Sequence, residues 1–158
     1  MKVRERASAL LISSNNRIFL FKFKFSSMFE NGKTLWITPG GGVKEGETYE
    51  ATLRRELYEE LGLEILIESK YVYARKKVFT DKKGIEFLSD ERYFIVKVNN
   101  EIVIYENMTN NEKENTKAGK WWSLEEIQSS NEKFFVDGLD KILENILSNN
   151  IPSSPQEI

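Results

Sequence analysis

The chain has 158 residues, of which 40% are hydrophobic and 30% charged, a composition typical of one globular domain of ordinary size. Its net charge of −2 gives no electrostatic argument for binding to nucleic acid or to a membrane surface. The absence of Cys and His excludes a disulfide scaffold, thiolate or imidazole metal ligands, a Ser-His triad and cysteine nucleophiles.

The N-terminal segment does not resemble a targeting sequence. Its apolar run stops at Ser13, which is too short for a membrane span and does not make a convincing signal peptide. A chain without cysteine also suits a reducing compartment. We therefore expect a cytoplasmic protein that has no membrane partner.

The first part of the chain predicts three strands. Ala7–Ile12 is a short apolar run typical of a buried strand, and a polar turn follows it. Arg17–Phe25 alternates strictly, with four phenylalanines on one face, and should pair with the first strand as a hairpin. Thr34–Thr38 is a shorter strand that leads into glycines, and we interpret its Trp36 as a core residue.

A glycine turn followed by a helix occupies the stretch Gly41–Leu63. Thr48 is a good N-cap residue, and Gly62 is placed to end the helix in the left-handed conformation. A leucine stripe should pack on a sheet and consists of Leu53, Leu57 and Leu61.

Three carboxylates share a neighbouring face of this predicted helix. Glu56, Glu59 and Glu60 are spaced i, i+3 and i+4, and at about 100° per residue they lie within roughly 100° of one another. Like charges at these spacings disfavour a helix by a few tenths of a kcal/mol per pair, unless the face is solvated or holds a cation. Glutamate-rich faces are usually only solvated, so the trio alone is weak support for a metal site.

The surrounding letters change that interpretation. The pattern G-x5-E-x7-R-E-U-x-E-E-x-G-U, where U is aliphatic, is met at every position from Gly41 to Leu63. Its seven invariant letters coincide by chance with a probability on the order of 10⁻⁸ per start position. The chain thus resembles the Nudix hydrolases. The resemblance implies an α+β fold, the Nudix-type α/β/α sandwich around a mixed β-sheet, in which this box forms a loop–helix–loop.

The resemblance also implies a metal site and roles for its residues. Glu56 and Glu60 are expected to be the main metal ligands, and the backbone carbonyl of Gly40 a further one. Glu59 is either a water-bridged ligand or the base that deprotonates the attacking water, and the choice stays open. Oxygen ligands without His or Cys favour Mg²⁺ or Mn²⁺ over zinc.

Arg55 lies beside the carboxylate face. It either forms a surface ion pair of little value or grips Glu47 or Glu59 as a bidentate fork, and the resemblance favours the fork. The expected catalytic group is therefore Glu59, Glu56, Arg55 and Glu47.

Outside the box the candidate site residues are weaker. Lys22 and Lys24 on the alternating strand are either solvated or bind substrate phosphates. The asparagine-rich segment 107–119 is expected to be a loop that offers an additional metal-binding carboxylate, and Glu112 fits the resemblance better than Glu114.

The second half of the chain predicts further strands and two helices. Residues 64–70, 71–79 and 91–98 are predicted strands, and a turn at 81–84 precedes the last of them. Of the residues that enter this last strand, Asp90, Glu91 and Arg92 could face a pocket, although an exposed strand end is the more ordinary interpretation.

The C-terminal part predicts a capped helix, an amphipathic helix and a tail. Ser123 with Glu126 forms a capping box, and Lys133–Leu147 has the period of an amphipathic helix. Residues 148–158 show no period and are expected to be frayed. We therefore predict a single Nudix domain at 1–147.

By resemblance, the expected activity is metal-dependent hydrolysis of the pyrophosphate linkage of a nucleoside diphosphate joined to another group, with water attacking phosphorus. The expected partner is a small nucleotide or nucleotide sugar, and a homodimer stays open. Two alternatives are a non-catalytic ligand sensor and an RNA cap hydrolase. Nucleic acid is disfavoured because no basic stripe with interleaved aromatics is evident beyond residues 75–77.

Overall fold

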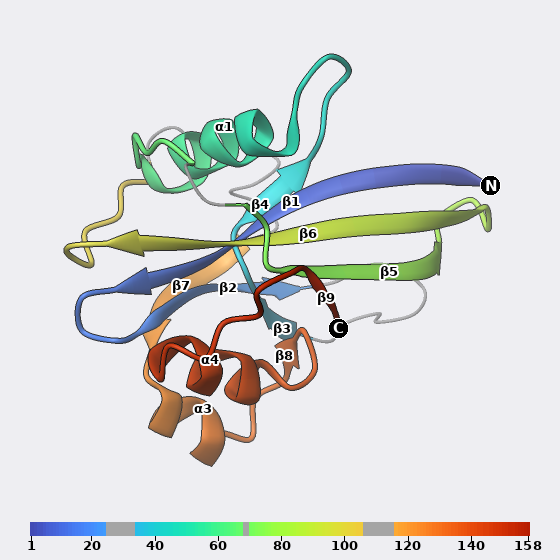
Figure 1. Ribbon diagram of the computed structural model, residues 1–158. Helices are drawn as coiled ribbons and strands as arrows, with labels where there is room; N and C mark the ends of the chain where they lie inside the picture. The colour runs from blue at the N-terminus through green and yellow to red at the C-terminus, as the bar shows by residue number, and fades with distance from the viewer. Residues whose placement is uncertain (25–33, 68–69, 106–115) are drawn as a thin grey trace.

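The computed structural model of the protein describes residues 1–24, 34–67, 70–105 and 116–158, without the side chains of 24 and 116–118 (Figure 1). The strands are β1 Lys2–Ser13, β2 Ile18–Lys24, β3 Thr34–Ile37, β4 Gly40–Gly42, β5 Tyr73–Thr80, β6 Glu86–Val98, β7 Thr116–Trp122, β8 Phe134–Phe135 and β9 Gln156–Glu157. The helices are α1 Tyr49–Leu61, α3 Leu124–Ser129 and α4 Leu139–Leu147. None of the helices in these described ranges is long and apolar enough to cross a membrane.

The strands form one mixed sheet in the order β8-β3-β2-β1-β6-β5-β9, to which β4 adds beside β1 and β7 beside β2. β1 runs parallel to β6 over its whole length, from Lys2 opposite Phe87 to Ser13 opposite Val98. On its other edge, β1 pairs with β2 near Ile12 but with β4 from Arg6 to Ser8. The sheet therefore divides along β1, and this division creates the cavity described below.

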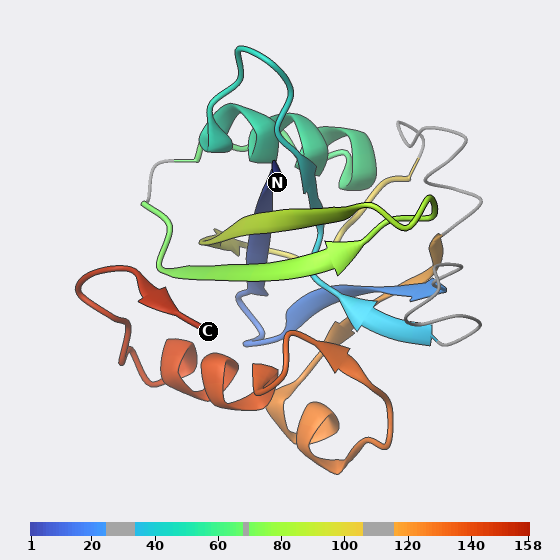
Figure 2. The same cartoon turned by 90° about the vertical axis from the view of Figure 1, so that its right-hand side faces the viewer.

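Helices cover the two faces of the sheet, as both views show (Figures 1 and 2). The leucine stripe of α1 is fully buried against Ala9, Phe94 and neighbouring residues on one face. On the other face, Leu139 and Leu143 of α4 pack in a second core cluster. The predicted α/β/α sandwich around a mixed sheet is thus confirmed.

Both predicted ends of α1 are confirmed. The Thr48 side chain accepts a hydrogen bond from the backbone N–H of Ala51 at 3.0 Å. Gly62 has φ 67°, and its N–H donates to the last carbonyls of the helix. Because glycine adopts this left-handed conformation without steric cost, the helix stops there and its leucine stripe stays in register with the sheet.

Three predictions about local structure are wrong. The loop expected at 107–119 ends earlier, because β7 begins at Thr116. The predicted strand at 64–70 is absent from the described part of that segment, although Ile65 and Ile67 still pack against the core. The predicted helix at 133–147 begins only at Leu139, after Gly138 with φ 78°. Before it, the β8 strand pairs in parallel with β3, because the aromatic rings there pack on the core, with the Phe134 ring 5.0 Å from that of Trp122.

The prediction of a frayed tail is also wrong at its end. β9 pairs in parallel with β5: the N–H of Gln156 donates to the Val72 carbonyl at 3.0 Å, and that of Ile158 to the Ala74 carbonyl at 2.9 Å. Ile158 also packs against the α4-side core cluster. The edge strand β5 offers unpaired backbone N–H and C=O groups, and the tail binds to these. Because this pairing uses the backbone, the side-chain pattern of the tail does not predict it.

Candidate functional site

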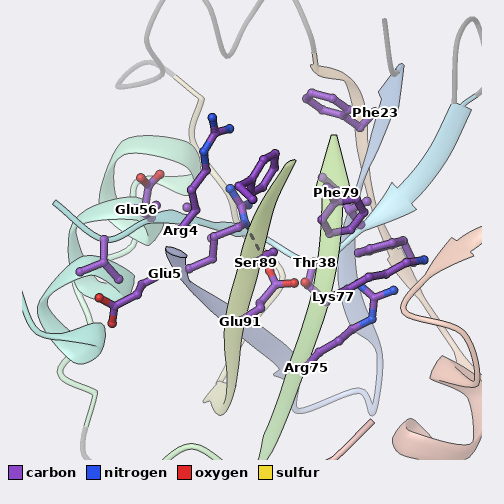
Figure 3. Close-up of a pocket in the computed structure, with 18 of the residues that line it drawn as sticks. Arg4, Glu5, Phe23, Thr38, Glu56, Arg75, Lys77, Phe79, Ser89 and Glu91 are labelled. Carbon is purple, nitrogen blue, oxygen red and sulfur yellow. Dashed lines mark hydrogen bonds and ion pairs between the residues drawn. The ribbon is translucent and has the colours of Figure 1, made fainter. Parts of the chain in front are cut away.

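A cavity of about 920 Å³ lies where the sheet divides (Figure 3). One wall comes from β1, β6 and β5, and the other from β2, β3 and Phe135. The glycine strand β4 and the acidic face of α1 close one end. The cavity thus brings the predicted box residues together with residues far away in the sequence.

Arg55 is the centre of a carboxylate cluster on the wall of this cavity. Its Nε and Nη2 each donate to one oxygen of Glu47 at 2.9 Å, so the predicted bidentate fork is confirmed for this partner. Its Nη1 donates to Glu56 Oε1 at 2.9 Å and to Glu59 Oε2 at 3.4 Å. Three of the predicted carboxylates therefore share one guanidinium.

The Arg55–Glu47 ion pair shifts the pKa of both side chains. The hydrogen bonds from Arg55, and next that from the Lys44 backbone N–H at 3.0 Å, lower the pKa of Glu47 to about 2. The same pairing with Glu47 raises the pKa of Arg55. Glu47 also accepts from the Thr52 hydroxyl at 3.0 Å. Glu47 is therefore an ionised anchor that orients Arg55 toward the other carboxylates.

Glu60 lies at the junction of α1 and β4. It is buried, and its Oε1 accepts a hydrogen bond from the Gly40 backbone N–H at 2.9 Å. A Cβ at Gly40, where φ is 152°, would lie 2.1 Å from the Ala7 carbonyl oxygen. Only glycine fits this approach of β4 to β1, and the approach presents the Gly40 backbone to the helix. The role of its carbonyl as a metal ligand stays a prediction.

The carboxylate of Glu56 occupies the space that a side chain at Gly41 would need. A Cβ there would lie 2.2 Å from Glu56 Oε1. Glu56, Glu59 and Glu60 all line the cavity and offer only oxygen donors, which suits a hard divalent cation. Within the described ranges no three acidic side chains converge as a ready cation site. Arg55 and the Gly40 N–H hold carboxylate oxygens of these three residues instead.

The weaker predicted site residues are not brought into this cluster. Phe21 and Phe23 line the cavity, so Lys22 between them points to the opposite face, where it pairs with Glu132 at 3.6 Å. Of the two alternatives for Lys22, the phosphate contact is therefore wrong for this cavity. The side chain of Lys24 lies outside the described residues, and so do Glu112 and Glu114.

Basic residues that were not among the predicted site residues line the sheet wall instead. Arg4 of β1 and Lys77 of β5 lie on either side of Ser89 of β6, and Arg6 and Arg75 lie on either side of Glu91, two residues further along. The Arg4 guanidinium lies 3.8 Å from the centroid of the Phe87 ring. The alternation of residues along β1 and β5 places these cations on one face of each strand. The sequence alone does not show that this face lines the cavity, because that depends on β1 and β5 both pairing with β6.

Glu91 lies between Arg6 and Arg75 on the neighbouring strands. It is buried rather than at an exposed strand end. It lines the cavity with 8% of its surface exposed. Its carboxylate accepts hydrogen bonds from Ser8 Oγ at 2.5 Å and Tyr93 OH at 2.7 Å, and from Arg6 Nε at 3.5 Å. Burial, and then the charge of Glu91, raise the pKa of Tyr93 well above its usual value.

Several curated relatives carry the name RNA pyrophosphohydrolase. The protein from Psychromonas ingrahamii is 44% identical over 54 residues, which is 34% of this chain and 26% of the relative. That from Aliivibrio fischeri is 28% identical over 104 residues, covering 60% of this chain and 57% of the relative. The chain thus matches between a quarter and three fifths of the length of these two relatives.

Solved structures share the fold at low identity. The E. coli ORF135 protein superposes with a TM-score of 0.65 at 22% identity, over 95% of this chain and 92% of its own. The MutT protein from Methanosarcina mazei Go1 gives 0.64 at 19% identity, over 94% and 96%. The NUDIX domain model matches residues 2–146, which include the sheet division, the Arg55 cluster and all of α4 except its last residue. On this match and the complete box, the chain belongs to the Nudix family.

Proposed function

We propose that the protein is a divalent-cation-dependent hydrolase that cleaves the pyrophosphate linkage of a nucleoside diphosphate joined to another group, by attack of water on phosphorus. The observation that carries this proposal is the Arg55 cluster on the cavity wall, with Glu47, Glu56 and Glu59 held at one guanidinium. A structural ion-pair network has no need of a large cavity beside it, whereas a hydrolase has.

The cation is proposed to be Mg²⁺ or Mn²⁺, held by Glu56 and Glu60, with Glu59 and the Gly40 carbonyl as further candidates. When bound, such an ion stabilises negative charge on the phosphate oxygens. The space left by Gly41 supports the assignment, because it admits the Glu56 carboxylate beside the backbone of β4. The chain's own residues supply the rest: Glu47 fixes Arg55, and Arg55 orients the carboxylates.

Glu59 is our first candidate for the group that accepts the proton of the attacking water. Its side chain is 29% exposed, against 12% for Glu56, and its contact with Arg55 is the longer of the two. A base must reach a water molecule in the cavity, and Glu59 is the less constrained side chain. Glu56 remains the alternative base.

The proposed substrate class is a small nucleotide or nucleotide sugar in the cytoplasm. A second candidate is the 5′ end of an RNA, which two observations favour. The curated relatives are named for RNA pyrophosphohydrolysis, although each match is partial. In addition, Arg4, Arg75 and Lys77 line the cavity and could contact phosphates beyond the one that is cleaved.

The test is phosphate release from a panel of substrates with Mg²⁺ or Mn²⁺. The panel contains nucleoside triphosphates, ADP-ribose, NADH, nucleotide sugars, dinucleoside polyphosphates, capped RNA and a 5′-triphosphorylated RNA. A phosphatase converts primary products to free phosphate, and EDTA is the control. We expect turnover of one class that EDTA abolishes. Turnover of the RNA alone would favour the second candidate.

Glu56→Gln should lower turnover by at least about 100-fold, because a neutral amide cannot serve as an anionic ligand or base. Glu50→Gln is the matched control: Glu50 is exposed in the first turn of the same helix and should leave turnover unchanged. Equal rates for both variants would refute the assignment. Metal binding without turnover of any substrate would instead support a ligand sensor.

A further inference from the structure

The cavity has a second polar centre at Glu91, away from the Arg55 cluster. Burying a carboxylate carries a desolvation cost, and a good ion pair is needed to offset it. The only ion pair of Glu91 among the described residues is with Arg6, at 3.5 Å, and Arg6 is 41% exposed. Such a contact contributes little to stability. The ion pair with Arg6 therefore does not by itself offset the cost of burying this carboxylate.

The carboxylate is nevertheless held firmly. Ser8 and Tyr93 each donate a hydroxyl hydrogen bond, one to each oxygen. Ser8 is fully buried and Tyr93 nearly so, which leaves the carboxylate little freedom to turn. In Figure 3, Glu91 extends from β6 toward Thr38 on the opposite wall of the cavity. An anion that is rigidly oriented into a cavity is arranged for recognition.

The acceptor sites of Glu91 are only partly used. An ionised carboxylate has about four of them. Among its described contacts, Oε1 accepts only from Tyr93, while Oε2 accepts from Ser8 and, at a long distance, from Arg6. One site on Oε1 remains, and the long contact on Oε2 is readily replaced. Two adjacent donors on a ligand could therefore bind both oxygens at once.

The position of Glu91 says which part of a ligand it meets. It would repel a phosphate group, so the phosphates must lie elsewhere in the cavity. Glu91 is connected to the catalytic end through Ser8, which lies beside Gly40, whose N–H holds Glu60. From β6 over β1 to β4 is two strand spacings, about 10 Å. This is the length scale on which a nucleoside extends from its phosphate.

We propose that Glu91 reads the nucleoside part of the substrate by accepting hydrogen bonds from two adjacent donors on it. Two groups of a nucleotide present such a pair: the N–H edge of guanine and the 2′,3′-diol of ribose. The inference rests on the proposed function, because it takes the pyrophosphate to lie at the Arg55 cluster. It adds that Glu91 determines which nucleotide is preferred.

The test measures binding of mononucleotides, so that its result does not depend on turnover. Dissociation constants of GMP, dGMP, IMP and AMP are measured by calorimetry. These mononucleotides contain no pyrophosphate linkage, so they are not hydrolysed by the proposed activity. We expect Glu91→Gln to weaken GMP binding by about 10- to 100-fold, because one acceptor oxygen is replaced by an NH₂ donor and the other loses its negative charge. If Glu91 binds the guanine edge, wild type should prefer GMP to IMP, and Glu91→Gln should shift the preference from GMP toward AMP. If Glu91 binds the 2′,3′-diol of ribose, wild type should prefer GMP to dGMP.

Glu101→Gln is a closely matched control. Glu101 accepts from Ser13 Oγ at 2.7 Å and lies 3.6 Å from Arg17, the same Ser–Glu–Arg arrangement, but it is not part of the cavity wall. It should leave all four constants unchanged. Glu91→Asp keeps the charge beside Arg6 but withdraws the oxygens by one methylene. It should also weaken GMP binding, and it serves if Glu91→Gln does not fold.

Two results would overturn the proposal. One is a wild type that binds none of the four mononucleotides. The other is folded Glu91 variants whose constants change no more than those of Glu101→Gln. Phosphate release is measured separately, so either result can be told apart from a failure of the hydrolase proposal itself.

Discussion

Adjacent glycines of β4 have different physical reasons to be glycine. Gly40 is required by the backbone of β1, since any Cβ there would overlap the Ala7 carbonyl. Gly41 is required by a side chain of the proposed site, because the Glu56 carboxylate fills the space of a Cβ. The absence of a side chain at Gly40 therefore serves the approach of β4 to β1, and its absence at Gly41 makes room for Glu56 of the proposed site.

Gly41→Ala should separate these two roles. The new methyl group displaces a flexible carboxylate rather than backbone, so we expect a folded protein whose kcat/KM falls by about tenfold or more, equivalent to roughly 1.4 kcal/mol of transition-state stabilisation. Turnover of the best substrate and the melting temperature are measured together. Gly42→Ala is the control, because its Cβ has no atom nearer than 4.0 Å. Similar losses in both variants would contradict this account.

The ion pair of Glu47 predicts a specific dependence of stability on pH. Its pKa is about 2 in the folded protein against an ordinary value of 4.5. Its stabilising contribution is therefore complete above pH 4.5 and is lost as the pH falls from 4.5 through 2. Urea unfolding at several pH values should show a shallower loss in Glu47→Gln than in wild type. Glu45→Gln, an exposed neighbour, should follow wild type, and a curve for Glu47→Gln that is equally steep would contradict the pairing.

At the scale of one element, α1 joins two functions on neighbouring faces. Its leucine stripe is seated on the sheet, and its glutamates face the cavity. The caps at Thr48 and Gly62 set where the helix begins and ends. Since successive faces of a helix are fixed relative to one another, seating the leucines also aims the carboxylates.

Thr48→Ala should therefore destabilise the protein by about 1 kcal/mol, the usual value of a lost N-cap hydrogen bond. Urea unfolding at neutral pH measures the change. Thr48→Ser retains a hydroxyl acceptor and should stay close to wild type. If the serine and alanine variants lose the same free energy, the cap hydrogen bond to Ala51 is not the cause.

At the scale of the whole molecule, the C-terminal segment closes the edge of the sheet at β5. Deleting residues 156–158 removes two backbone hydrogen bonds and the packing of Ile158, and we expect a loss of about 1–3 kcal/mol. Turnover should persist, because these residues do not line the cavity. Glu157→Gln, which alters only an exposed side chain, is the control. An unchanged melting temperature after the deletion would show that the pairing does not stabilise the fold.

The sequence by itself determined the parts of this protein whose signals are local. The caps and leucine stripe of α1, the Asp81–Gly84 turn and the capping box at Ser123 all appear in the structure as predicted. Each depends on residues a few positions apart, so its physics is complete within one segment. The family box belongs here too, since its glutamates and Arg55 lie on one helix within reach of Glu47.

Tertiary structure alone decided what comes from distant segments. Glu91 looked like an exposed strand end, because its partners Ser8 and Arg6 are more than eighty residues away. For Lys22 a solvated position and a phosphate contact both stayed open, because the pattern does not reveal which face of β2 meets the cavity. The tail looked frayed, because its partner is a sheet edge. Alternation along a strand assigns residues to two faces, but only the neighbouring strands decide which face becomes core, solvent or cavity.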